Sequence, residues 1–198
     1  MSSDDLPPAS GRGAEHFDVP TRFYLTNRED IERWAALGKT ASNAIHKLHL
    51  GMEDDVAEIA ERVGLTGGLF RTGSNYRTWL LSRPDTPVGS DTAPMAAIGL
   101  RWHRHNTVID EPKLAARAGV RISDRTVRED FLELDGGLRP IRDGHGYKSD
   151  TFWPIYRSVP RDGAWWSDLD AYREQLMEHL ADVVALFEPR LRQLPGQQ

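Results

Sequence analysis

The sequence predicts an α+β fold: an antiparallel sheet of about four strands packed by an N-terminal helix pair and a long C-terminal helix. Two kinds of apolar spacing predict it. Residues 94–105 alternate between largely apolar and largely polar positions, as a strand with two different faces does. Residues 26–63 and 167–191 carry apolar residues three and four positions apart, which indicates amphipathic helices. Helices and strands in separate blocks favour the α+β class.

The N-terminal helix pair is predicted at residues 26–50 and 52–63. Thr26 followed three positions later by Glu29 is a capping-box pattern, which is typical of a helix start. Acidic residues open the second helix, where the positive end of the helix dipole stabilises negative charge. We interpret residues 22–25, which precede the pair, as a short strand or an anchoring segment.

Four strands are predicted, at residues 76–83, 95–105, 119–123 and 151–159. Residues 84–94 contain three prolines and form the long connection of an antiparallel hairpin between the first two strands. The glycine-rich residues 65–75 are predicted to be a loop. Residues 106–118 fit either a strand or a short helix, and the sequence leaves both open.

The C-terminal helix is the clearest element, because Ser167 suits its N-cap and one apolar stripe runs from Leu169 to Leu191. The domain prediction is a single α+β domain over residues 20–192. Residues 1–19 are rich in Ser, Asp, Pro and Gly and are predicted to be a disordered or loosely bound arm. Residues 193–198 are predicted to be a disordered tail.

The composition narrows the class of protein. The chain has no cysteine, which excludes disulfides, thiolate metal sites and a cysteine nucleophile. No apolar run approaches the roughly 20 residues of a membrane span, and the N-terminus lacks the features of a signal peptide. We therefore expect a soluble cytoplasmic protein with no membrane partner. The net charge is −5, but residues 71–161 hold 15 Lys and Arg against 11 Asp and Glu, so the centre is mildly basic.

The leading functional hypothesis places a binding surface on the strand at residues 95–105. Arg101, His103 and His105 share one face of this strand because side chains alternate. Arg71 and Arg77 are expected near the rim of that face. Arginine and imidazole groups suit an anionic ligand, so we expect a binding or regulatory protein. The ligand is a phosphorylated small molecule, a nucleic-acid segment or an acidic partner surface.

The competing hypothesis is a hydrolase that depends on a divalent metal. His103 and His105 have the spacing of two ligands for one metal ion, but a catalytic site needs a third ligand. Asp110, Asp143 and His145 are the candidates for it. Apart from this metal, no cofactor is predicted. If no metal binds, we expect the imidazoles of His103 and His105 to be hydrogen-bonded to neighbouring groups on a polar face of the sheet.

Two short stretches, Pro84-Asp85 and Glu111-Pro112-Lys113, match the letters of the PD-(D/E)xK nuclease pattern. The resemblance covers these two spots alone. It implies that Asp85 and Glu111 hold Mg²⁺ beside the scissile phosphate and that Lys113 positions or activates water. The sequence departs from the family at Pro112, which suits a helix start or a turn more than the apolar strand on which the family carries this pair.

His145 is a further candidate catalytic residue. It lies between two glycines in a polar loop and is a candidate general base, although a single loop histidine is usually only exposed. The C-terminal helix leaves a homo-oligomer open, because its single apolar stripe suits a second copy or the protein's own sheet equally well.

Overall fold

The structure is a computed structural model that describes residues 17–86, 88–105, 115–134, 137–138, 141, 144–160 and 165–194. The chain divides into two compact units, Met1–Thr40 and Ala41–Gln198, and the boundary falls inside helix α2 (Arg28–Leu50). Most of the predicted arm at residues 1–19 and of the predicted tail at 193–198 lies outside the described residues.

The described part of the first unit consists of helix α1 (Val19–Thr26) and the beginning of α2. Asp18 caps α1, because its carboxylate accepts a hydrogen bond from the Thr21 N–H at 2.8 Å. Pro20 suits the first turn, where a helix leaves N–H groups without a partner. Residues 22–25 are thus helical, so the strand interpretation was wrong, and the interpretation as an anchoring segment stays a prediction. The unit exposes several large apolar side chains, among them Phe23, Trp34 and Leu37.

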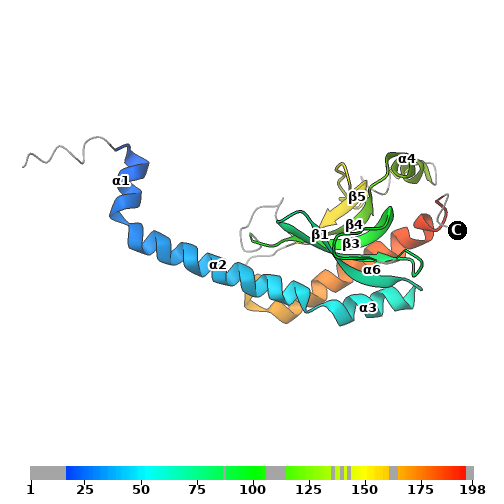
Figure 1. The fold of residues 1–198 in the computed structure, drawn as a ribbon, viewed down its shortest axis with the longest axis horizontal. Coiled ribbons are helices and arrows are strands. Elements are labelled where there is room, and N and C mark those ends of the chain that lie inside the picture. Colours follow the sequence, from blue (N-terminus) through cyan, green and yellow to red (C-terminus); the bar gives the residue numbers. More distant parts are fainter. Residues whose placement is uncertain are drawn as a thin grey trace, which may run out of the picture. The chain divides into compact units, whose positions relative to one another are not determined.

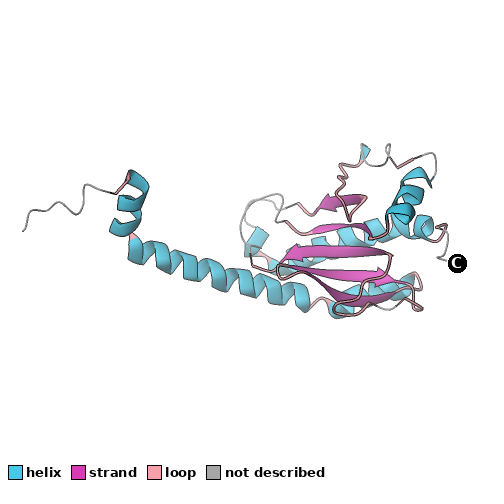
Figure 2. Cartoon of the chain, turned by 45° about the horizontal axis from the view of Figure 1, so that its top comes forward, coloured by secondary structure: helices cyan, strands magenta, loops and turns pink. Residues whose placement is uncertain are grey.

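The second unit is built on a five-stranded antiparallel sheet (Figure 2). Its strands are β1 (Thr66–Thr72), β2 (Tyr76–Ser82), β3 (Ala96–His103), β4 (Arg117–Ile122) and β5 (Ile155–Ser158). Each strand pairs with the next one in the chain, so the order across the sheet is β1-β2-β3-β4-β5 and β3 lies at the centre. The predicted α+β class is confirmed, and the sheet has one strand more than expected.

The additional strand is β1, which falls in the glycine-rich residues 65–75 that were predicted to be a loop. Its seven residues pair with β2 in continuous antiparallel register. A Cβ atom at Gly67 would lie 3.1 Å from Val56 Cγ1, and one at Gly68 would lie 2.7 Å from Val88 Cβ. The glycines therefore allow other segments to approach the strand closely, and they do not mark a flexible loop.

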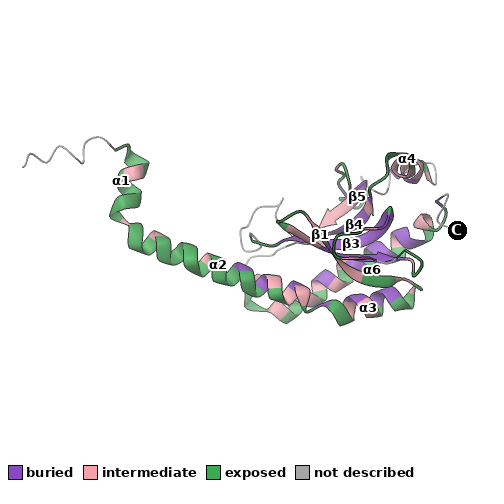
Figure 3. Cartoon of the chain, viewed as in Figure 1, coloured by how far each residue is buried: buried purple, intermediate pink, exposed green. Residues whose placement is uncertain are grey.

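Helices α3 (Glu53–Arg62) and α6 (Leu169–Leu191) pack against one face of the sheet (Figure 1). Asp168 caps α6 by accepting a hydrogen bond from the Ala171 N–H at 2.9 Å, so the cap lies one residue after the predicted Ser167. The core between these layers includes Ile98, Leu100, Trp102, Leu176 and Phe187. Buried residues follow the central strands and the sheet-facing sides of both helices (Figure 3). We call this side of the sheet the helix face.

Two shorter helices also belong to this unit. Helix α4 (Arg125–Glu133) is capped by Asp124, which accepts a hydrogen bond from the Val127 N–H at 3.0 Å, and it buries Phe131. The 3-10 helix η3 (Trp165–Ser167) precedes α6. The ring of Trp165 lies 4.6 Å from that of Tyr172, which fixes η3 against the start of α6.

We expect Gly119→Ala to lower the free energy of unfolding by about 1–3 kcal/mol. A Cβ atom at Gly119 would meet the carbonyl oxygen of Ile155 and lie 2.7 Å from Tyr156 Cα, and neither backbone atom moves without disturbing β5. Urea unfolding measures the effect. Gly38→Ala is the matched control: a Cβ there meets nothing within 4 Å, so the same substitution in a helix should stabilise by up to about 1 kcal/mol. Equal shifts in the two variants would contradict this account.

Candidate functional site

The face of the sheet opposite the helix face carries three arginines. In the register of β3 and β4, Arg101 lies directly opposite Arg117, and Gly99 lies opposite Gly119. Arg121 follows Gly119 by two positions and so projects from the same face. We call this side the arginine face, defined by Arg101, Arg117 and Arg121.

Each of the three guanidinium groups lies over an aromatic ring. Arg101 Cζ is 3.8 Å from the centroid of Tyr76, which projects from the neighbouring strand β2. Arg117 Cζ is 4.5 Å from the Tyr156 centroid, on β5. Arg121 Cζ is 5.0 Å from the Phe70 centroid, on β1. These are cation–π distances, so the rings orient the guanidinium groups across the sheet.

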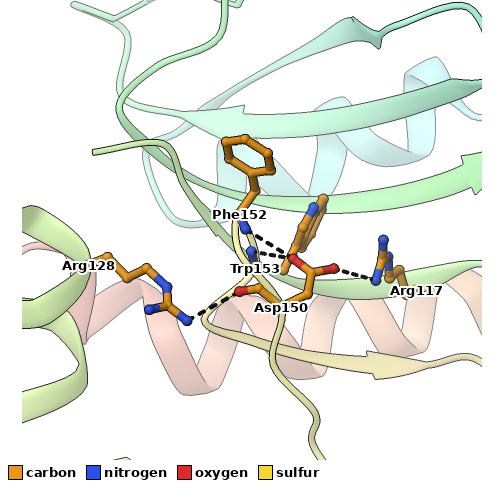
Figure 4. A network of polar contacts seen from close by, with 5 residues as sticks. All are labelled: Arg117, Arg128, Asp150, Phe152 and Trp153. Atoms are coloured by element: carbon orange, nitrogen blue, oxygen red, sulfur yellow. Dashed lines mark hydrogen bonds and ion pairs between the residues drawn. The ribbon is translucent and has the colours of Figure 1, made fainter. Parts of the chain in front are cut away.

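Asp150 is the acidic partner on this face. Its Oδ2 accepts a hydrogen bond from Arg117 at 2.9 Å, and the Arg117 side chain is only 16% exposed. Its Oδ1 accepts the N–H groups of Phe152 at 3.0 Å and Trp153 at 2.9 Å (Figure 4). Arg128 of α4 donates to the Asp150 carbonyl at 3.2 Å. Asp150 therefore holds the turn before β5 in place and neutralises one of the three arginines.

No carboxylate among the described residues forms an ion pair with Arg101 or Arg121. Burial, followed by the charge of Arg117, lowers the pKa of Arg101 to about 10. Burial also lowers the pKa of Arg121. Both groups stay charged at neutral pH, so the face keeps positive charge whose solvation by water is restricted.

His103 lies at the end of the arginine face, as the alternation in β3 predicts. Its ring packs edge-on against Tyr76 at 4.9 Å, and its Nδ1 accepts the N–H of His105 at 3.2 Å. Burial lowers the pKa of His103, and the neighbouring His105 and Arg101 lower it further. The neutral imidazole is therefore favoured, with its proton on Nε2.

The His103 and His105 ring centroids are 6.4 Å apart. The described residues contain no group of three His, Asp or Glu side chains arranged to hold a metal ion. Asp110 and Asp143, two of the candidate third ligands, lie outside those residues. The metal hypothesis thus gains no support from the described part of the chain and stays a prediction.

Arg71 and Arg77 do not join the arginine face. Arg77 is the register partner of Trp102, which packs in the core, and Arg71 is the partner of Arg77. Both therefore project to the side of the helix face, where Arg77 also donates to the Tyr76 carbonyl at 2.8 Å. Burial, and then the charges of Arg104 and Arg71, lower the pKa of Arg77. These two arginines form a separate basic group near the turn that joins β1 to β2.

The residues of the nuclease pattern are only partly described. Asp85 lies in the loop between β2 and β3, where its carboxylate is 63% exposed and forms an ion pair with Arg83 at 3.2 Å. Glu111 and Lys113 lie outside the described residues. A nuclease site in which Asp85 and Glu111 hold Mg²⁺ and Lys113 acts on water therefore stays a prediction.

His145 lies apart from the arginine face. It is exposed and lines a shallow groove of about 340 Å³ together with Tyr147, Arg157 and Asp182. Arg157 donates to Asp182 at 3.2 Å across this groove. Arg157 alternates with Tyr156 along β5, so the groove lies on the opposite side of the sheet from Arg101. His145 and Arg101 thus belong to different surfaces.

Sequence reasoning missed Arg117, Arg121 and Asp150. The spacing of Arg117, Gly119 and Arg121 places the two arginines on one face only if the predicted third strand at residues 119–123 begins two residues earlier, as β4 does. Which face of the sheet they share follows only from the pairing of β4 with β3. Asp150 carries no sequence signal for its role, because the turn that it stabilises is not regular.

A comparison with protein-family models, with curated proteins and with solved structures finds no match to this chain. In the described part of the chain, no helix combines the length and the apolar character that a membrane crossing requires.

Proposed function

We propose that the protein binds an anionic ligand on the arginine face and that the ligand carries a phosphate group. The observation that supports this most strongly is the pairing of Arg101 with Arg117 on adjacent strands, with Asp150 as the single carboxylate bonded to either of them in the described part of the chain. Like charges directly opposite each other on a sheet are destabilising. An anion bridging the two guanidinium groups removes that repulsion.

The chemistry of arginine favours a multidentate oxyanion. A guanidinium group offers five donors in a planar fork that matches the oxygens of phosphate, and charge-assisted hydrogen bonds are about twice as strong as neutral ones. The Nε of Arg101 is buried and has no hydrogen-bond acceptor among the described residues. A phosphate would therefore meet the terminal N–H groups of Arg101, which the contact with Tyr76 already holds in place.

The three aromatic stacks offer a purely structural explanation of the arginines, but it is incomplete. A cation–π contact contributes about 0.5–2 kcal/mol, and it neutralises no charge. Three cations on one face still repel one another, and the lowered pKa of Arg101 reflects burial first and that repulsion second. A structural role alone leaves Arg101 without an ion-pair partner among the described residues.

The experiment is titration calorimetry with inorganic pyrophosphate on the wild type, Arg101→Gln and Arg117→Gln. Each variant should bind about tenfold more weakly, because each loses charge-assisted hydrogen bonds to the ligand. Arg125→Gln is the matched control: its side chain is 92% exposed on α4, away from the sheet. Arg101→Gln removes both the repulsion from Arg117 and the cation–π contact with Tyr76. The two effects oppose each other, so the melting temperature of this variant should change little.

Two polymers tested in parallel identify the ligand class. A single-stranded oligodeoxythymidine represents nucleic acid and a polyglutamate peptide represents an acidic partner surface. Binding of either that is tighter than that of pyrophosphate and sensitive to Arg101→Gln assigns the face to that class. Equal affinities of Arg101→Gln and Arg125→Gln for all three probes would rule out the arginine face as the binding site.

A further inference from the structure

A cavity of about 430 Å³ opens at the end of the central strands that lies away from Arg101. It lies where β2 ends and β3 begins, next to the C-terminal ends of α3 and α6. The arginine pair Arg101 and Arg117 lies near the opposite end of β3, so the two sites are separate. A volume of this size is in the range of pockets that take small organic ligands.

Small side chains leave this space unfilled. Ala96 begins β3 on the helix face, and Gly64 ends the turn after α3, so no large side chain enters from either segment. The apolar part of the wall is made by Leu65, Leu81 and Leu191. An apolar ligand in this space would bury surface against leucines without displacing any core side chain.

The polar part of the wall is held in place by contacts between elements. Glu188 of α6 has a side chain only 11% exposed and is hydrogen-bonded to Arg192 one turn later. Arg192 also donates to the Val63 carbonyl at 2.8 Å, which ties the end of α6 to the end of α3. The carboxylate of Glu188 is thus neutralised within the protein, and this pair forms a fixed wall.

Arg83 is the remaining charge on the wall. Its side chain is 33% exposed, and its one ion pair among the described residues is with Asp85, whose carboxylate is 63% exposed and does not line the cavity. An ion pair so exposed to water is weak, so most donors of Arg83 are available to a ligand. The lining therefore combines an apolar pocket with one accessible cation.

We infer that this cavity binds a small apolar molecule carrying one carboxylate, with the apolar body against Leu65, Leu81 and Leu191 and the carboxylate on Arg83. The charge of the lining supports this choice. The cavity is lined by two arginines, Arg83 and Arg192, and by one glutamate, Glu188, which is already paired with Arg192. The inference does not depend on the ligand of the arginine face.

The test uses 2-naphthoate, with the neutral 2-naphthalenemethanol as the matched probe, and follows naphthalene fluorescence. Wild-type protein should bind one naphthoate per chain about tenfold more tightly than the alcohol, because only the carboxylate interacts with Arg83. Arg83→Gln should abolish this difference between the probes. Leu191→Trp, at a partly exposed position, should weaken both probes by filling the cavity.

Arg101→Gln is the control variant, because it alters the arginine face and leaves the cavity intact. It should bind naphthoate as the wild type does. The inference is overturned if naphthoate does not bind at millimolar concentration, or if Leu191→Trp and Arg83→Gln bind it as tightly as Arg101→Gln does. Naphthoate binding that is lost in Arg101→Gln would assign the probe to the arginine face and overturn the inference as well.

Discussion

Trp102→Ala should lower the free energy of unfolding by about 3–5 kcal/mol, the cost of removing a fully buried tryptophan. Trp102 is 1% exposed and lies on β3, the central strand. Its indole N–H donates to His46 Nδ1 at 3.0 Å, and its ring stacks on His49 at 5.1 Å. The substitution leaves a large cavity between the sheet and the end of α2. It also removes the N–H group that donates a hydrogen bond to His46.

Two further variants separate these effects in urea unfolding. Trp102→Phe keeps an aromatic ring but loses the N–H, so about 1–2 kcal/mol should be lost, in part for the unsatisfied nitrogen of His46. Trp166→Ala removes an indole that is 59% exposed and should change stability by less than about 1 kcal/mol. If Trp102→Ala unfolded at the same urea concentration as Trp166→Ala, the packing at the end of α2 would not be as described.

Trp102 illustrates what the sequence does predict. Alternation in residues 95–105 places Trp102 on the core face and Arg101 and His103 on the other, and the structure has them so. The C-terminal helix can be predicted from the sequence equally well, because its apolar stripe is regular over six turns. Local periodicity decides both of these features, and no distant segment changes them.

The composition of the arginine face was harder to predict, because it depends on how strands pair. Arg77 was expected near the rim of the face that carries Arg101, but its position opposite Trp102 puts it on the other side of the sheet. A one-residue change of register reverses this outcome, and the long connection between β2 and β3 does not fix the register. The same reason concealed Arg117. The extra strand β1 was missed because glycine is usually unfavourable in strands, whereas here tight packing against Val56 and Val88 requires it.

Asp150→Ala should lower the free energy of unfolding by about 3 kcal/mol. The substitution removes the acceptor of two backbone N–H groups, those of Phe152 and Trp153, and it leaves Arg117 without its carboxylate beside Arg101. The loss is measured by urea unfolding. Asp124→Ala, which removes a carboxylate that caps the exposed start of α4, is the control and should cost only about 1 kcal/mol. A smaller loss for Asp150→Ala than for Asp124→Ala would contradict this role.

Asp150→Asn separates the structural role of this residue from its charge. The amide oxygen still accepts the two backbone N–H groups, but the amide NH₂ group takes the place of the oxygen that accepts from Arg117, so only part of the stability lost in Asp150→Ala should be retained. The negative charge that competes with an anion for Arg117 is gone, and pyrophosphate should therefore bind several-fold more tightly than to the wild type. Weaker binding would mean that Asp150 takes part in ligand binding, for example through a bridging cation. Unchanged binding would place the ligand away from Arg117, against the proposed use of the arginine face.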